Sequence, residues 1–235
     1  MLEVGTGMGK RTRYIAAAAV LALAAVLYIF AADIMVRAFA AANGLDIAYK
    51  DAGNVWFTRF VFADLRVAER KSGVGFSAEA ADIRIRLRKG SISADFNFRG
   101  VRLIREKGAR ESSYDSIDGL VASPFASSWK YETISGTAER REDGLILKDV
   151  RAVSDDIRLS VNGALHKDAT VDADIMIYFS PNITRKVPEE LTKVVLTDEP
   201  EGWKSISVKL NGNYLAPSIQ LSSKLFRLNI RSVSP

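Results

Sequence analysis

The chain contains no cysteine and a single histidine, and these two scarcities exclude several classes of protein. Without cysteine there is no disulfide framework, no cysteine-based zinc or iron–sulfur site and no thiol nucleophile. With His166 alone, one chain holds neither a histidine-rich metal centre nor a relay of several histidines. The remaining composition is ordinary: 26% of the 235 residues are charged and 48% are hydrophobic, which indicates a folded domain.

One apolar run stands out near the N-terminus. The stretch from Tyr14 to Ala32 has no charged residue, and it follows three cations, Lys10, Arg11 and Arg13. Because a helix of about 20 apolar residues crosses a bilayer, this run predicts a single transmembrane span. Cations favour the cytoplasmic side, so residues 1–13 are expected in the cytoplasm and the body of the chain on the far side of the membrane.

A cleaved signal peptide is the alternative interpretation of this run, since Ala38-Phe39-Ala40 matches a cleavage sequence. The run is longer than the usual apolar region of such a peptide, and Asp33 and Arg37 precede the cleavage site, which favours an uncleaved anchor. In both cases the body is exported. Asp33 and Arg37 have i,i+4 spacing and Asn43-Gly44 is typical of a helix end, so a helix and stalk are expected over 14–43.

After Gly44 the spacing of the apolar residues changes from helical to alternating. In the clearest example, Ile83, Ile85 and Leu87 alternate with arginines, and a Lys89-Gly90 turn leads to a second alternating stretch. This pattern predicts a hairpin with one apolar and one solvated face. Similar alternation continues to residue 221 with Gly, Asn and Asp turns between the stretches, so we predict a mainly antiparallel β fold.

Two stretches depart from the alternation. Residues 107–130 are rich in Ser, Gly and Asp and predict a loop, whereas residues 188–197 begin with Pro and two glutamates and predict one short helix. We therefore expect a curved antiparallel sheet, either an open trough or a closed sandwich, formed by two sheet segments or one continuous sheet. The expected segments are a cytoplasmic tail (1–13), a transmembrane helix and stalk (14–43), a membrane-proximal β segment (44–110), a loop (111–130) and a C-terminal β segment (131–235).

Positive charge is concentrated in the membrane-proximal segment. Residues 66–110 carry twelve cations and five anions, whereas the whole chain has a net charge of +5. Nucleic acid is a poor candidate partner beyond a membrane, and the interleaved residues are Ile and Leu rather than exposed aromatics. Anionic lipid head groups or an acidic protein fit better, and a solvated sheet face that resists edge-to-edge aggregation is the simplest alternative.

The sequence contains no arrangement that indicates catalysis, a cofactor or a metal. Serine hydrolase chemistry would need His166 as its base, but no nucleophile-elbow sequence accompanies it. Asp172 and Asp174 share one face of an alternating stretch, but no further oxygen ligands follow at an established calcium-loop spacing. We therefore expect a protein that is not an enzyme and has neither a cofactor nor a metal.

The order of motifs from residue 133 to residue 222 is more specific. It contains the stretch DIRLSVNGAL at 156–165, a strand ending in Ser180-Pro181, a short helical stretch, and a strand that reaches Gly212 with Pro217 downstream. This order resembles that of the AsmA-like group of bacterial envelope proteins, which includes the related type II secretion protein N. A single N-terminal anchor with an exported β body is similar to that group as well.

The resemblance implies lipid handling in a bacterial envelope. It implies a single-pass inner-membrane protein with a periplasmic body, acting in lipid transport or outer-envelope maintenance, with the membrane and phospholipid or glycolipid as partners. Acyl chains would lie on the apolar sheet face, and the arginines would favour anionic head groups. The alternative is an assembly scaffold similar to type II secretion protein N, which docks envelope or secretion-system proteins by edge-strand pairing. The residues expected to bind lipid are Ile83, Ile85, Leu87, Ile92, Phe96, Phe98, Arg84, Arg86 and Arg88.

Overall fold

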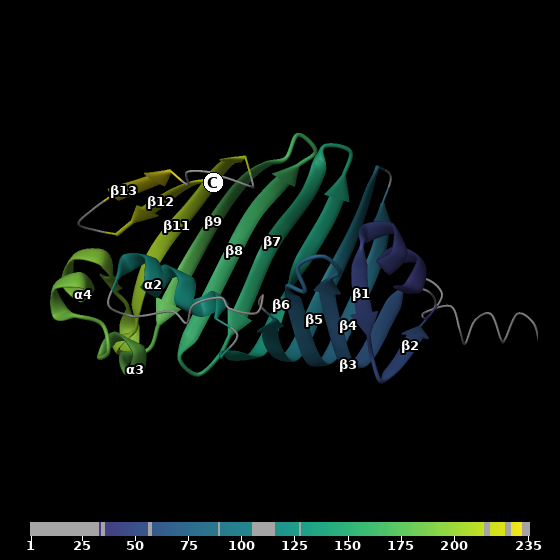
Figure 1. The fold of residues 1–235 in the computed structure, drawn as a ribbon, viewed down its shortest axis with the longest axis horizontal. Coiled ribbons are helices and arrows are strands. Elements are labelled where there is room, and N and C mark those ends of the chain that lie inside the picture. The colour runs from purple at the N-terminus through teal and green to yellow at the C-terminus, as the bar shows by residue number, and fades with distance from the viewer. Residues whose placement is uncertain are drawn as a thin grey trace, which may run out of the picture.

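The architecture is one open antiparallel sheet (Figure 1). The computed structural model describes residues 33, 36–55, 58–88, 90–104, 116–126, 128–213, 217–223 and 227–231. Its thirteen strands follow the order β1-β3-β4-β5-β6-β7-β8-β9-β11-β12-β13, with β2 paired to β3 and β10 paired to β11. The prediction of a mainly β, antiparallel fold is confirmed, and the sheet is a single open one rather than a sandwich of two.

The thirteen strands form one continuous sheet, in which β4 and β5 are the longest with 14 residues each. Pairing of β5 with β6 joins the two expected β segments into one continuous sheet. The strands are β1 (Leu45–Ala48), β2 (Asp51–Val55), β3 (Arg59–Glu69), β4 (Gly75–Arg88), β5 (Ser91–Ile104), β6 (Lys130–Arg141), β7 (Gly144–Val153), β8 (Ile157–His166), β9 (Thr170–Phe179), β10 (Thr197–Asp198), β11 (Lys204–Asn213), β12 (Ser218–Ser222) and β13 (Arg227–Arg231).

The part of the chain that the structure describes contains few helices, but more than the single short helix that the sequence predicts for the body. The short helix predicted over 188–197 is confirmed as α4 (Glu189–Val195), which follows α3 (Pro181–Thr184). The segment expected to be a loop over 111–130 contains α2 (Ile117–Ala122) and the 3-10 turn η1 (Ser123–Phe125). A second 3-10 turn, η2, spans Pro200–Gly202, and residues 36–43, here named helix 36–43, are helical.

The predicted membrane span over residues 14–32 lies outside the described residues, as does the tail 1–13. Among the residues that the structure describes, no helix combines the length and the apolar character needed to cross a bilayer.

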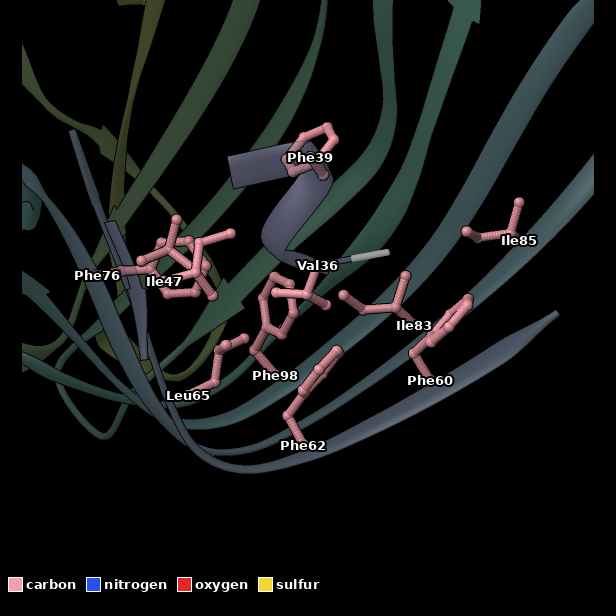
Figure 2. Close-up of a pocket in the computed structure, with 11 residues that line it drawn as sticks. Val36, Phe39, Ile47, Phe60, Phe62, Leu65, Phe76, Ile83, Ile85 and Phe98 are labelled. Carbon is pink, nitrogen blue, oxygen red and sulfur yellow. The ribbon is translucent and has the colours of Figure 1, made fainter. Parts of the chain in front are cut away.

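One face of the sheet is apolar from end to end. Residues directly opposite each other in a sheet share a face, and the pairing Phe60↔Ile83↔Phe96 begins one such apolar row. Farther along the sheet, Leu159 pairs with Ile177, which pairs with Ile206. This face lies on the inside of the sheet's curve: around β3 and β4 the ribbon bends like a bowl, with helix 36–43 inside it (Figure 2).

Local irregularities accompany the bend. The register shifts between Ser135 and Thr137 and again between Leu147 and Val150, as expected for β-bulges, which bend and twist a strand. Gly100 in β5 has a φ of 62°, and a Cβ there would lie 2.4 Å from the Glu79 side chain, so this position requires glycine. The curvature therefore has a local cause in the strands.

Candidate functional site

An apolar cavity lies between helix 36–43 and the first strands of the sheet (Figure 2). Its volume is about 390 Å³. Every side chain that lines it is aliphatic or aromatic, so it offers neither a hydrogen bond nor a charge to a ligand. The lining residues are Val36 and Phe39 from helix 36–43, Ile47 from β1, Phe60, Phe62, Leu65 and Val67 from β3, Phe76, Ile83 and Ile85 from β4, and Phe98 from β5.

The floor of the cavity is built by cross-strand packing. Phe62 pairs with Ala81, and Ala81 pairs with Phe98, so a small residue separates two aromatic rings. The Phe98 ring also lies 5.3 Å from the Phe76 ring and 5.2 Å from the Phe96 ring, as measured between ring centroids. Aromatic pairs at such distances contribute stability in addition to that from burial of their apolar surface, so ring packing stabilises the floor of the cavity.

Helix 36–43 is held in place by polar contacts around Asp33. The Arg37 Nε donates to an Asp33 carboxylate oxygen at 2.6 Å, which confirms the predicted i,i+4 pair, and the Tyr49 hydroxyl donates to the same carboxylate. The helix ends at Asn43, and Gly44 follows with a φ of 65°, as predicted from the sequence. Desolvation and the hydrogen bond to Asp33 raise the pKa of Tyr49 to about 12.

Three of the six apolar residues expected to bind lipid line the cavity: Ile83, Ile85 and Phe98. Phe96 lies next to them, because its ring stacks on that of Phe98. Leu87 and Ile92 pair with each other at the end of the β4–β5 hairpin, where they are 76% and 49% exposed. All six therefore share one face of the sheet, but only part of the set borders the cavity.

The predicted arginines lie on the opposite face. Since side chains alternate along a strand, Arg84 and Arg86 point away from the face that carries Ile83 and Ile85. Arg86 forms an ion pair with Asp95 on this outer face. The backbone of Arg88 pairs with Ser91, and its side chain lies outside what the structure describes. The structure thus does not bring the arginines and the apolar residues together into one site.

The outer face has other paired charges near these arginines. The Arg59 guanidinium donates two hydrogen bonds to Asp82, at 3.0 and 2.6 Å, and holds the pKa of that carboxyl below its usual range. Lys130 donates to Glu79 at 2.6 Å. Arg59 and Lys130 lie outside residues 66–110, so two of the five anions of that segment pair with cations from elsewhere in the chain, and these pairs leave its excess of positive charge in place.

The sequence did not single out most of the cavity wall. Phe60, Phe62 and Leu65 come from β3, where the positive φ of Asp64 (51°) shifts the alternation between Phe62 and Leu65. Val36 and Phe39 belong to helix 36–43, which the sequence indicated only as a stalk. The spacing of Val36 and Phe39, three residues apart, was the available signal that one side of this helix is apolar.

A second apolar cavity occupies the other end of the same face. Its volume is about 370 Å³, and it lies between the α2–η1 segment and strands β9, β11 and β12. The lining residues are again apolar: Val121, Ala122, Phe125, Ile175, Ile177, Val208, Leu210, Ile219 and Leu221. The apolar face therefore holds space at both ends of the sheet.

Titratable residues do not assemble into a reactive centre in the part of the chain that the structure describes. No group of three or more His, Cys, Asp or Glu side chains is arranged there to hold a metal ion. Asp172 and Asp174 both face Lys209, whose Nζ is 3.9 and 3.7 Å from their carboxylate oxygens. These two carboxylates are partners of a lysine on the neighbouring strand.

Comparison with known proteins gives no relative of this chain: no protein-family model, curated protein or solved structure matches it. The resemblance to the AsmA-like group stays a prediction.

Proposed function

We propose that this chain is a membrane-anchored, AsmA-like envelope protein that binds acyl chains on its apolar sheet face, in lipid transport or outer-envelope maintenance. The observation that supports this proposal is the 390 Å³ cavity with its wholly apolar lining. Binding pockets for small molecules commonly have volumes of about 300–1,000 Å³, so the cavity has room for part of a lipid tail.

The chemistry of the lining favours hydrocarbon over polar ligands. Each CH₂ group that leaves water contributes about 0.8 kcal/mol, whereas a polar group without a hydrogen-bond partner is costly to bury. The cavity of Phe, Ile, Leu and Val side chains has no such partner to offer. An acyl chain is therefore the best chemical match, and no bond needs to be made or broken during binding.

The position of the cavity suits a ligand that comes from a bilayer. Helix 36–43 forms one wall of the cavity, and in the sequence residue 36 is four positions beyond the end of the predicted span over 14–32. In the proposed topology, with residues 1–13 cytoplasmic and the body periplasmic, the cavity lies beside the outer surface of the inner membrane.

Site-specific photocrosslinking in cells tests the proposal on the full chain. Phe60, on the cavity wall, is replaced by p-benzoylphenylalanine in one variant, and Val61, exposed on the opposite face of the same strand, in its matched control. With ³²P-labelled lipids, irradiation is expected to give a labelled band for the Phe60 variant and at least tenfold less label for the Val61 variant. Equal labelling of both, or none, would contradict acyl-chain binding in the cavity.

The second candidate function, an assembly scaffold, is favoured by the open edges of the sheet. Among the described strands, β13 pairs with β12 alone, so the backbone groups along its other side face no strand. Such edges accept an added strand from another protein. In the same experiment, crosslinks to protein from positions on β13, together with no lipid label at Phe60, would favour the scaffold.

A further inference from the structure

A polar pocket lies on the other side of helix 36–43 from the apolar cavity. Its volume is about 450 Å³. It is formed by the helix, strand β1 with Tyr49, and the turn between β3 and β4. Its charged or hydroxyl-bearing side chains are Asp33, Arg37, Asp46, Tyr49 and Arg70.

The two hollows are adjacent. Val36 and Ile47 line both of them, so the apolar space and the polar one share part of their walls. A molecule that fills both must carry a hydrocarbon part and a polar part joined within a short distance. This is the construction of a membrane lipid.

The two arginines that line the polar pocket come from different elements. Arg37 belongs to helix 36–43, and its side chain stays 78% exposed although it donates to Asp33. Arg70 is in the β3–β4 turn, where its backbone N–H donates to the Gly44 carbonyl at 3.0 Å and fixes the turn beside the helix end. Within the described part of the chain, the Arg70 guanidinium forms no ion pair.

The carboxylates of the pocket differ in what they are bound to. Asp33 accepts hydrogen bonds from both Arg37 and Tyr49, so its charge is already partnered. Asp46 is exposed on β1. A guanidinium has five donors in a planar fork that matches phosphate oxygens, so Arg70, with the free donors of Arg37, offers a site for a phosphate group.

We propose that the polar pocket binds the phosphate of a phospholipid whose acyl chain occupies the apolar cavity across helix 36–43. This inference rests on the proposed function, because it assumes an acyl chain in that cavity. It assigns the recognition of the head group to Arg70 and Arg37 in the polar pocket, instead of to the arginines of β4 on the outer face.

Two lipids that differ only in the phosphate test this inference. The full chain, purified in detergent, is incubated with phosphatidic acid or diacylglycerol that carry the same diazirine-labelled acyl chains, irradiated, and analysed by mass spectrometry for adducts. The wild type is expected to capture phosphatidic acid about tenfold more than diacylglycerol, as charge-assisted hydrogen bonds to one phosphate imply. Adducts are expected on residues of the apolar cavity.

Variants separate the pocket from the cavity. Arg70→Gln is expected to bring the capture ratio close to one by lowering capture of phosphatidic acid alone, whereas Asp46→Asn is expected to raise the ratio. Arg151→Gln, an exposed arginine on β7, is the control and is expected to leave the ratio unchanged. If Arg70→Gln leaves the ratio unchanged or lowers capture of both lipids equally, the phosphate site is wrong although acyl binding stands. If the wild type captures neither lipid, the proposed function fails as well.

Discussion

The two ends of the sheet present the same apolar face but cover it differently (Figure 1). At the β9 end, α3 and α4 pack on it beside the second cavity, which the α2–η1 segment borders, and Ile177, Phe179, Ile183 and Ile206 are at most 1% exposed. At the β3 end, helix 36–43 is the one described helix that crosses the face, and the most deeply placed aromatic residues, Phe60 among them, keep 5% exposure beside the cavity. Whether the apolar face acts as a core or as a surface is thus decided by the segments that cover it.

The covering at the β9 end is fixed by specific contacts. The Ser180 hydroxyl donates to Asp156 at 2.6 Å and the Asn182 amide donates to the same carboxylate at 3.1 Å, which ties the start of α3 to the β7–β8 turn. On the outer side, the Arg158 guanidinium lies 4.0 Å from the centre of a Trp203 ring. At the β3 end, the described contacts that position the helix are those of Asp33 with Arg37 and Tyr49, and the Arg70 N–H bond to the Gly44 carbonyl.

The largest difference between the two ends is expected for truncation of a buried phenylalanine. Phe179→Ala should lower the free energy of unfolding by about 3–5 kcal/mol, because Phe179 is fully buried and lines neither apolar cavity, so its loss opens a new hole. Phe60→Ala should cost clearly less, since Phe60 already borders open space. Urea unfolding of the full chain in detergent, followed by tryptophan fluorescence, measures both. Equal losses would mean that the β3 end is packed as tightly as the β9 end.

Filling the cavity tests whether its space serves binding. Val67→Trp should abolish the ³²P-lipid label at position 60 while changing the free energy of unfolding by less than about 1 kcal/mol, because the added ring enters existing space. Val61→Trp, on the opposite face of the same strand, should leave the label unchanged. Retention of label in Val67→Trp would place the lipid elsewhere.

The hydrogen bond from Tyr49 to Asp33 is expected to make a moderate contribution to stability by attaching helix 36–43 to the sheet. Tyr49→Phe removes the donor to Asp33 and should lower stability by about 0.5–1.5 kcal/mol, with faster hydrogen exchange in residues 36–43 and unchanged exchange in α4. The folded pKa of Tyr49, about 12, is above the ordinary value of 10. Its contribution is therefore complete below pH 10 and lost as the pH rises through about 12. A Tyr49→Phe variant with the same pH profile as the wild type between pH 10 and 12 would contradict this assignment.

The smallest effect is expected on the outer face. Replacing Arg84 and Arg86 together by Gln removes one exposed ion pair with Asp95, which contributes about 0.2–1 kcal/mol at most. The lipid label at position 60 should stay within about twofold of the wild type, because these side chains point away from the cavity. A large loss of label would restore the arginines of β4 to a head-group role.

Local sequence signals predicted the elements whose structure depends on near neighbours. The Lys89-Gly90 turn and the alternation on both sides gave the β4–β5 hairpin, in which Leu87 pairs with Ile92. The proline followed by two glutamates at 188–190 predicted the short helix that the structure shows as α4. These features follow from backbone preferences within a few residues, so one sequence is sufficient to find them.

Other features needed information that is distant in the sequence. Helix α2 was not predicted, because the Ser, Gly and Asp residues around it are typical of a loop. The available signals were the helical spacing of Ile117, Leu120 and Val121 and the position of Ser116, which caps the helix by accepting from the Gly119 N–H at 3.1 Å. The cavity depends on which strands helix 36–43 reaches, and alternation alone says nothing about that. It did indicate that arginines and isoleucines of β4 point in opposite directions.

The order of strands has a consequence for size. From β3 to β8, each strand pairs with the strands that precede and follow it in the chain. Neighbouring strands lie about 4.8 Å apart, so one inserted or deleted hairpin changes the reach of the sheet by about 10 Å and leaves the contacts at both ends intact. The width of the sheet from its first strand to its last is therefore set by the number of hairpins in the chain.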